Sequence, residues 1–185
     1  MTQRLRVSIR APVASDCSAF LGAVARSASL HGRWVSAPAT AKAFAKYLGR
    51  FDSQSHFGFL VVHRDSRELV GVINLGHVIR GGLQSAFLGY YAFSPFERQG
   101  LMHEGIALVI RYAFEKLKLH RLEANVQPGN RASIALIKRC GFVREGFSRR
   151  YLKIRGRWRD HERWALLNVD FKGVSSDCTR TKGRS

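Results

Sequence analysis

The sequence has few cysteines, and none of them is paired in a recognisable motif. Cys17, Cys140 and Cys178 are odd in number and far apart. This excludes a disulfide framework and a CxxC metal motif, and the histidines have no metal-ligand spacing, so we expect no metal. No apolar run approaches the roughly 20 residues of a membrane span, and no apolar stretch follows the basic N-terminus. We therefore expect a cytoplasmic protein with no membrane contact.

Acidic residues are also scarce. The chain has 13 Asp and Glu against 31 Lys and Arg, which gives a formal net charge of +18. The positive charges are spread along the chain, so they indicate attraction to an anionic partner such as nucleic acid, a ribosome or a phosphorylated ligand. A surface that is basic only for solubility is the alternative.

The 185 residues are enough for one domain with a sizeable core. We expect a single domain over residues 1–171, followed by a disordered basic tail at 172–185. Hydrophobic periodicity predicts a mixed α/β (α+β) domain with a largely antiparallel sheet of about seven strands and about four helices. Strands are expected at 5–9, 57–62, 68–79, 85–93, 121–127, 146–154 and 160–171. Helices are expected at 15–25, with Ser15 or Asp16 as the N-cap, and at 39–48, 101–117 and 132–140.

The stretch "SPFERQGLMHEG" (94–105) lies between an expected strand and an expected helix. Such a connection directs backbone N–H groups at a phosphate, and Arg98 adds a positive charge. The usual phosphate-binding fingerprints carry two or three glycines, whereas this turn has only Gly100 at its centre. By itself this stretch is about equally consistent with a phosphate-binding site and with a basic strand-to-helix connection that binds no phosphate.

A second stretch, "NVQPGNRASIALIKRCGF" (125–142), predicts a capped helix. Asn130 is placed to cap its N-terminus, while Gly141 and Phe142 are spaced for a Schellman ending. Ser133 lies one turn inside, where its low helix propensity suggests a polar role. Taken alone, Asn130 is most simply a helix cap.

Together the two stretches resemble those of the GNAT acyl-CoA N-acyltransferases, and most closely the RimJ/RimL-type ribosomal-protein N-terminal acetyltransferases. The resemblance extends from about Arg10 to Phe171. It is sharpest over "LGYYAF", "ERQGLMHE", "HRLEANVQPGN", "ALIKRCGFVREG" and "YLKIRGRWRDH". It departs from the family's usual turn, Gln/Arg-x-x-Gly-x-Gly/Ala, at Glu97 and Met102. We expect the Glu97 carboxylate to point away from phosphates or to pair with a neighbour such as Arg98.

The resemblance implies a GNAT fold whose sheet splays between "GYYAF" and "LEANV" to hold acetyl-CoA. The pantetheine would pair with backbone near Ala92 and Phe93, and an N–H near Phe93 would polarise the thioester. Asn130 would contact the cofactor through its amide, and Ser133 would protonate the departing thiolate. The pyrophosphate would lie beside Arg98 on the N–H groups of Gln99, Gly100, Leu101, Met102 and His103.

The resemblance also implies direct attack by a neutral amine. An acyl-enzyme on Cys140 is disfavoured because the negative end of a helix dipole opposes a thiolate there. No general base is evident, and the candidates are Glu104, Asp160 and Glu162. An α-amino group has a pKa near 8 and a lysine one near 10.4, so a missing base favours an N-terminal α-amine.

The acceptor is accordingly expected to be the N-terminus of a protein, most plausibly a ribosomal one. A small amine such as a polyamine, amino sugar or antibiotic is the first alternative, and a non-catalytic RNA- or ribosome-binding module of the same fold is the second. Monomer and homodimer both stay open. A ribosome or an acidic surface is a further candidate partner. Five arginines around the closing hairpin form either an electropositive rim of the acceptor groove, which would steer an acidic peptide or an RNA-bound protein, or a solvated strand face: Arg149, Arg150, Arg155, Arg157 and Arg159.

Overall fold

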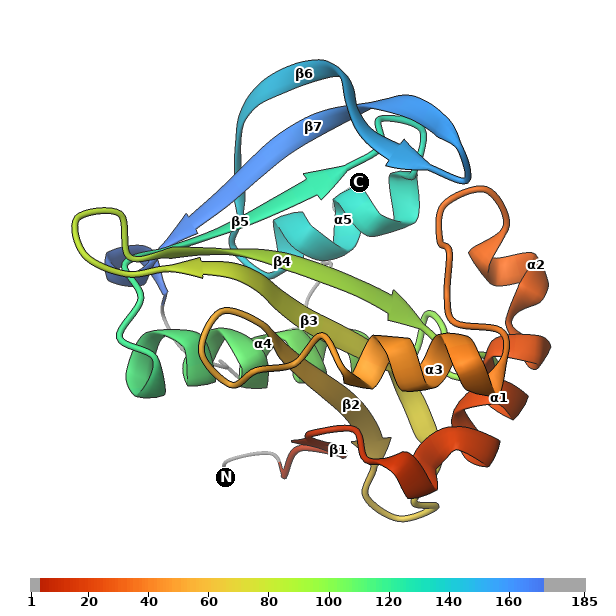
Figure 1. Cartoon of the computed structure of the whole chain (residues 1–185). Coiled ribbons are helices and arrows are strands. Elements are labelled where there is room, and N and C mark those ends of the chain that lie inside the picture. Colours follow the sequence, from red (N-terminus) through yellow and green to blue (C-terminus); the bar gives the residue numbers. More distant parts are fainter. Residues whose placement is uncertain (1–3, 172–185) are drawn as a thin grey trace, which may run out of the picture.

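A twisted sheet forms the centre of the computed structural model, which describes residues 4–171 (Figure 1). The tail expected at 172–185 lies outside the described residues. The described sheet has seven strands in the order β1-β2-β3-β4-β5-β7-β6. The strands are β1 (Val7–Arg10), β2 (Phe57–His63), β3 (Leu69–Ile79), β4 (Ser85–Ala92), β5 (Arg121–Val126), β6 (Val143–Ile154) and β7 (Arg157–Leu167).

One strand pair differs from the others. All neighbours are antiparallel except β4 and β5, which are parallel and pair only at residues 85–87 with 121–123. Beyond these residues the two strands diverge, so the edge of β4 at 88–92 has no strand partner on that side (Figure 1). The predicted splayed, largely antiparallel sheet is confirmed.

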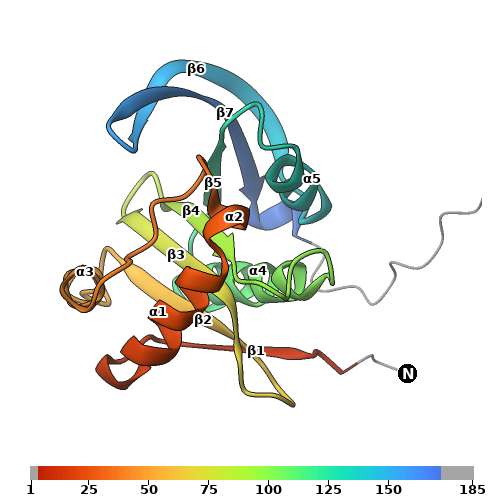
Figure 2. The same ribbon diagram turned by 90° about the vertical axis from the view of Figure 1, so that its right-hand side faces the viewer.

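Helices cover both faces of the sheet, as the turned view makes clear (Figure 2). Within the described residues they are α1 (Cys17–Arg26), α2 (Ala28–His31), α3 (Ala41–Leu48), α4 (Leu101–Arg111) and α5 (Arg131–Arg139). Residues of α4 pack in the larger hydrophobic core, and Phe20 of α1 packs against Phe44 of α3 in the smaller one. At Gly105, α4 lies so close to the sheet that a Cβ would stand 2.8 Å from Val61 Cγ2.

The N-terminal helices differ in detail from the sequence prediction. The short helix α2 was not expected, and a 3-10 turn (Ala14–Asp16) precedes α1. Neither Ser15 nor Asp16 caps α1 with its side chain. The Asp16 carboxylate accepts from Val13 N at 2.8 Å and pairs with Arg10 at 2.5 Å, because the cation and the free N–H are nearer than the N–H groups of α1.

Two later elements also differ. The expected helix at 101–117 ends in a π-helical segment, Tyr112–Lys116. β7 begins at Arg157, earlier than predicted, because Arg155 and Gly156 form the whole turn of the β6–β7 hairpin, with φ of 48° and 77°. Two successive positive φ values are those of a type I′ turn, which leaves the following residues free to pair.

No helix among residues 4–171 is both long and apolar enough to cross a membrane. The same residues contain no group of three or more His, Cys, Asp or Glu side chains placed to hold a metal ion.

Candidate functional site

A cavity of about 730 Å³ opens where β4 and β5 diverge. It is bounded by β4, by α5, by the turn before α4, and by α2 with the segment after it. The lining residues are Leu30, His31, Trp34, Val35, Tyr90, Tyr91, Ala92, Phe96, Glu97, Arg98, Gly100, Met102, His103, Asn130, Arg131, Ala132, Ser133, Ala135, Leu136 and Arg139.

The free edge of β4 presents backbone groups to this cavity. Phe93 N–H donates to Val70 O of β3 at 2.7 Å, and backbone groups alternate along a strand, so Tyr90 and Ala92 direct theirs away from β3. The Ala92 carbonyl indeed accepts from His31 Nε2 at 2.9 Å. The Phe93 N–H belongs to the sheet and Phe93 is fully buried, whereas Ala92 lines the cavity. The N–H near Phe93 that would polarise a thioester is therefore that of Tyr90 or Ala92, and this role stays a prediction.

The turn before α4 forms a second wall. Gly100 lies at the N-cap of α4 with φ 80° and ψ −5°, a left-handed conformation that favours glycine. Arg98 and Met102 line the cavity beside it, as does His103. Gln99 and Leu101 do not line it, and their predicted contribution would be limited to main-chain N–H groups. The Gln99 amide donates to Pro95 O at 2.8 Å, and the Leu101 side chain is buried in the core.

Helix α5 supplies the third wall, and its ends form as the sequence indicates. Asn130 Oδ1 accepts from Ser133 N at 3.2 Å, which caps the helix and leaves the amide N–H groups available to a ligand. At the other end, Gly141 N donates to Lys138 O and Phe142 N to Ile137 O, the two bonds of a Schellman motif. The caps hold the first turn of α5, with Asn130 and Ser133, at the cavity.

Ser133 has a hydroxyl partner that the sequence analysis missed. Its Oγ lies 2.7 Å from Tyr90 Oη, which lies also 3.2 Å from Ser133 O. Burial raises the pKa of Tyr90 above the ordinary value, so the phenol stays protonated. Only the divergence of β4 from β5 brings these two residues together. No spacing between residues 43 apart indicates the contact.

Glu104, predicted as a candidate base, lies outside the cavity lining. Its Oε2 accepts from Arg6 N at 2.7 Å and its Oε1 from Arg6 Nε at 2.7 Å. Arg6 Nη2 also donates to Gln99 O at 2.9 Å. In this arrangement the carboxylate ties the N-terminal segment to the first turn of α4, and the role of Glu104 as a base stays a prediction.

Asp160 and Glu162 also lie outside the cavity. Asp160 is exposed, and its Oδ1 accepts from Arg150 N at 2.7 Å across the β6–β7 hairpin. Glu162 accepts from Trp164 Nε1 at 3.1 Å and lies 3.6 Å from Arg144 Nε. Neither side chain lines the cavity, and the role of Asp160 as a base stays a prediction.

The electrostatics of the cavity are strongly positive. Arg98, Arg131 and Arg139 line it, and burial together with the nearby Arg139 lowers the pKa of His103. Among residues 4–171, Glu97 contributes the one carboxylate of the lining. Its Oε1 lies 3.4 Å from Ser94 Oγ rather than at Arg98, and its Oε2 is buried without a partner in the described structure.

α2 and the residues after it form a further wall of the cavity, which the sequence did not predict. His31 and Trp34 line the cavity, and burial lowers the pKa of His31. A Cβ on Gly129 would stand 3.1 Å from Trp34 Cη2, so this segment closely approaches the loop before α5. A four-residue helix has too little periodicity to predict, and its position depends on tertiary packing.

Comparison with known proteins agrees with this geometry. Residues 6–143 match the Acetyltransferase (GNAT) domain family, and the chain therefore belongs to that family. It is 43% identical over 119 residues to the probable N-acetyltransferase YjcK of Bacillus subtilis, covering 64% of this chain and 65% of YjcK. It is 38% identical over 117 residues to the [ribosomal protein uS5]-alanine N-acetyltransferase of Escherichia coli, covering 63% and 60%.

The matched region thus spans less than two thirds of either relative. Among solved structures, Mycobacterium smegmatis RimJ in complex with CoA-disulfide has a TM-score of 0.81 at 25% identity. That match covers 88% of this chain and 82% of the other. The expected GNAT fold is confirmed.

The residues present fit acetyl-CoA, the acyl donor of GNAT acetyltransferases. The open edge of β4 offers backbone donors to a pantetheine amide chain, and the start of α4 offers N–H groups beside Arg98 to a pyrophosphate. Arg131 and Arg139 add positive charge for further phosphate oxygens. Among residues 4–171, Glu97 is the one group of the lining with the opposite charge.

Proposed function

We propose that this chain transfers an acetyl group from acetyl-CoA to the N-terminal α-amine of a protein, most plausibly a ribosomal protein. The observation that carries the proposal is the composition of the cavity wall. Backbone donors of β4 and the Ser133 hydroxyl lie together, while Glu97 is the lone carboxylate in the lining among residues 4–171. Such a site suits an amine that needs little help in losing its proton.

The pKa of the acceptor decides how much help is needed. At pH 7 roughly a tenth of an α-amine with a pKa near 8 is neutral, against about one in 2,500 for a lysine near 10.4. The neutral nitrogen attacks the thioester carbon, a C–N bond forms and the C–S bond breaks, and water takes the proton lost by the amine. The catalytic residue is Ser133, whose hydroxyl would donate a proton to the departing thiolate and regain one from the water that took the amine proton.

Two other groups of the chain would assist. The N–H groups of Tyr90 and Ala92 face the cavity and would donate to the thioester oxygen as negative charge develops there. Asn130 and the first turn of α4 would hold the donor, through side-chain amide and main-chain N–H groups respectively.

An acyl-enzyme on a cysteine fits less well. Burial raises the pKa of the Cys140 thiol to about 12, so almost none of it is thiolate at neutral pH. Cys140 also packs against the larger core rather than lining the cavity. Direct attack requires no such nucleophile.

The polycationic acceptors fit the charge of the chain poorly. A polyamine or an aminoglycoside is polycationic, and a chain with a formal net charge of +18 would repel it. A binding module without catalysis would have no use for a serine hydroxyl in the cavity lining. The name of the Escherichia coli relative favours an N-terminal alanine on a ribosomal protein.

The test supplies labelled acetyl-CoA with a panel of acceptors. The panel contains peptides with free N-termini, the same peptides blocked at the N-terminus but carrying lysine, spermidine, and an aminoglycoside. We expect label on free N-termini alone. Label on spermidine or on the aminoglycoside would replace the proposed acceptor. Label on no acceptor, with no rise in melting temperature on adding acetyl-CoA, would reject the enzyme in favour of a binding module.

A further inference from the structure

The outer end of the β6–β7 hairpin carries a dense group of cations. Residues 147–159 contain six basic side chains and no acidic one. We call these six residues together with Trp158 the hairpin patch. Its cations are Arg149, Arg150, Lys153, Arg155, Arg157 and Arg159.

These cations are not neutralised by neighbouring carboxylates. The ion pairs within residues 4–171 involve Arg6, Arg10, Arg121 and Arg144, and no member of the hairpin patch. The nearby Asp160 carboxylate accepts from the backbone N–H of Arg150 at 2.7 Å, a bond that braces the hairpin. The patch therefore projects an almost uncompensated positive potential into solvent, which attracts a polyanion.

Both faces of the hairpin present this charge. Lys153 pairs with Trp158 across the two strands, so these side chains share one face, whereas Arg157 pairs with Ile154 on the opposite face. Arg149, Arg150, Lys153, Arg155 and Arg157 are all exposed. The cations thus surround the hairpin and do not form a single stripe along one side.

An exposed aromatic ring shares one face of the hairpin with Lys153. Trp158 is 60% exposed and pairs with Lys153, whereas its sequence neighbours Arg157 and Arg159 lie on the opposite face. Phe147, further along β6, is 46% exposed. An exposed indole is a good stacking platform for a nucleobase.

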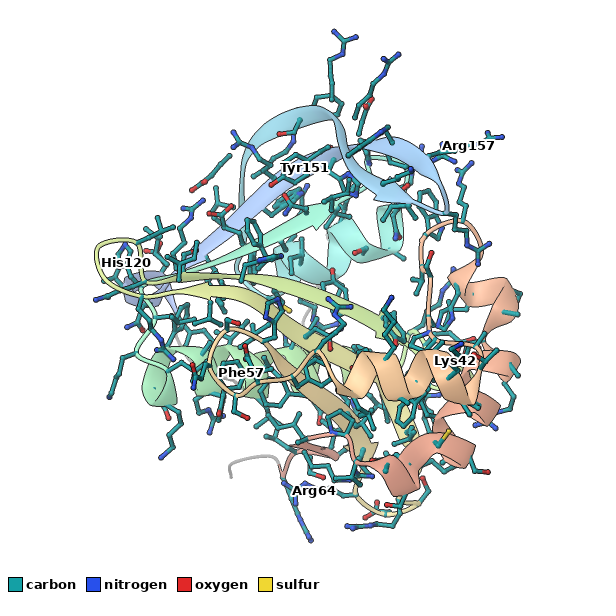
Figure 3. The ribbon with its side chains drawn as sticks, viewed as in Figure 1. Lys42, Phe57, Arg64, His120, Tyr151 and Arg157 are labelled. Carbon is teal, nitrogen blue, oxygen red and sulfur yellow. The ribbon has the colours of Figure 1, made fainter. Side chains whose placement is uncertain are left out.

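The hairpin patch lies next to the cavity. Arg155 Nε donates to Val35 O at 3.3 Å, and Val35 lines the cavity. In Figure 1 the tip of the hairpin reaches toward the segment after α2, and Figure 3 places Arg157 at that tip. A ligand held on the hairpin patch would stand at the mouth of the proposed acetylation site.

We propose that the hairpin patch binds RNA containing unpaired bases. Cations on both faces of a narrow ribbon match phosphates that can approach from both sides, whereas an acidic peptide would lie along one face. Trp158 adds a stacking partner for an unstacked base. An acidic peptide has no base to stack, and double-stranded RNA keeps its bases inside the duplex. The inference rests on the hairpin alone and stands whether or not the acceptor is a ribosomal protein.

The test measures binding of a fluorescent single-stranded RNA by anisotropy, from about 50 to 200 mM salt. The patch variant is Arg149→Gln/Lys153→Gln/Arg157→Gln. The matched control is Lys42→Gln/Lys46→Gln/Arg50→Gln, which removes the same charge from exposed positions in and just after α3. Figure 3 shows Lys42 well away from Arg157.

We expect the patch variant to flatten the slope of log K against log salt by about 2, because each lost phosphate contact contributes roughly 0.7 for single strands. The control should leave the slope nearly unchanged. Trp158→Ala should weaken binding about fivefold to 150-fold. Melting curves establish that each variant is folded.

Three results would overturn the proposal. Equal losses in the patch and control variants would mean that net charge alone attracts RNA. Binding of polyglutamate but not RNA would assign the patch to an acidic protein segment. Equal affinity for duplex and single-stranded RNA, with no effect of Trp158→Ala, would mean that the hairpin patch does not recognise unpaired bases. None of these readouts uses acetyl-CoA, so a failure here is distinguishable from a failure of acetyl transfer.

Discussion

Tyr90 of β4 and Ser133 of α5 are joined by a hydrogen bond of 2.7 Å between their hydroxyl oxygens. The two residues come from different walls of the cavity, and the bond fixes where the serine hydroxyl lies. Because the Tyr90 phenol stays protonated, it can donate to Ser133 Oγ and leave the serine proton free to point into the cavity. Tyr90 is thereby a positioning residue for Ser133.

Ser133→Ala should bind acetyl-CoA almost normally and turn over about a hundredfold more slowly, since a positioned acid contributes roughly 10²–10⁴ in rate. Tyr90→Phe should lower kcat less, by up to about tenfold, which is the value of one hydrogen bond. The double variant should be no slower than Ser133→Ala, because the tyrosine acts through the serine. Steady-state kinetics with calorimetric affinities measure all three, and unchanged turnover in Ser133→Ala would remove Ser133 from the mechanism.

Glu104→Gln tests the contact of Glu104 with Arg6. The substitution should lower the free energy of unfolding by about 1 kcal/mol, a small value because the Arg6 side chain is 48% exposed. It should also raise the KM for acetyl-CoA, since Arg6 holds Gln99 O in the turn before α4. The pH profile of kcat should keep its shape. Loss of the acidic limb of the kcat profile would identify Glu104 as the base.

Asp160→Asn is the companion to that experiment. The amide oxygen can still accept from Arg150 N, so we expect wild-type melting temperature and wild-type turnover. A large fall in kcat with stability intact would instead place Asp160 in the proton transfer.

Gly100→Ala should destabilise the turn before α4. Gly100 has φ 80°, and a Cβ there would stand 3.3 Å from Arg6 Nη2. The expected cost is about 1–2 kcal/mol, with a higher KM for acetyl-CoA. Gly82→Ala is the matched control, because its φ is not positive and its Cβ would meet nothing within 4 Å. If both variants behave alike in thermal melts, the left-handed turn has no special role.

The buried His31 should lower the free energy of unfolding in mild acid, because the unfolded chain then takes up a proton that the folded chain does not. Burial holds its folded pKa below the ordinary 6.5, so below that pH the unfolded chain binds the extra proton and the free energy of unfolding falls. His31→Gln keeps an N–H donor for Ala92 O and does not titrate. Between pH 7.5 and pH 5.5 the melting temperature of His31→Gln should fall by less than that of the wild type. His103 and His161, whose pKa values are also lowered, leave a residual slope.

Cys140→Ala separates direct attack from an acyl-enzyme. The buried thiol, with its pKa raised to about 12, should be dispensable, so kcat should stay within a few-fold of the wild type. A small loss of stability is expected because Cys140 packs against the core. Rapid quenching with labelled acetyl-CoA should find no label on the protein when the acceptor is omitted, and stoichiometric label would establish the covalent route.

Much of the fold could be predicted from local pattern. Strand alternation between residues 57 and 93, the broad apolar face of α4 and the caps of α5 at Asn130 and Gly141 all depend on neighbouring residues. The turn at Gly100 was recognisable for the same reason, since a strand, a glycine and a helix occupy one short stretch. These features follow from side-chain periodicity and backbone freedom, which the sequence displays directly.

The contacts between distant segments could not be predicted in this way. Glu104 had a plausible position for a base, yet an arginine 98 residues away takes its carboxylate. Phe93 was expected to face the ligand, but the parity of its pairing with Val70 turns its N–H into the sheet. The Tyr90–Ser133 hydrogen bond and the position of His31 in the cavity wall likewise depend on which elements the divergence of β4 and β5 brings together. The sequence by itself therefore determined most of the elements, the caps of α5 and the family, because those rest on local chemistry. Tertiary structure alone decided which polar groups face the cavity, because a side chain can satisfy only the partner that packing places beside it.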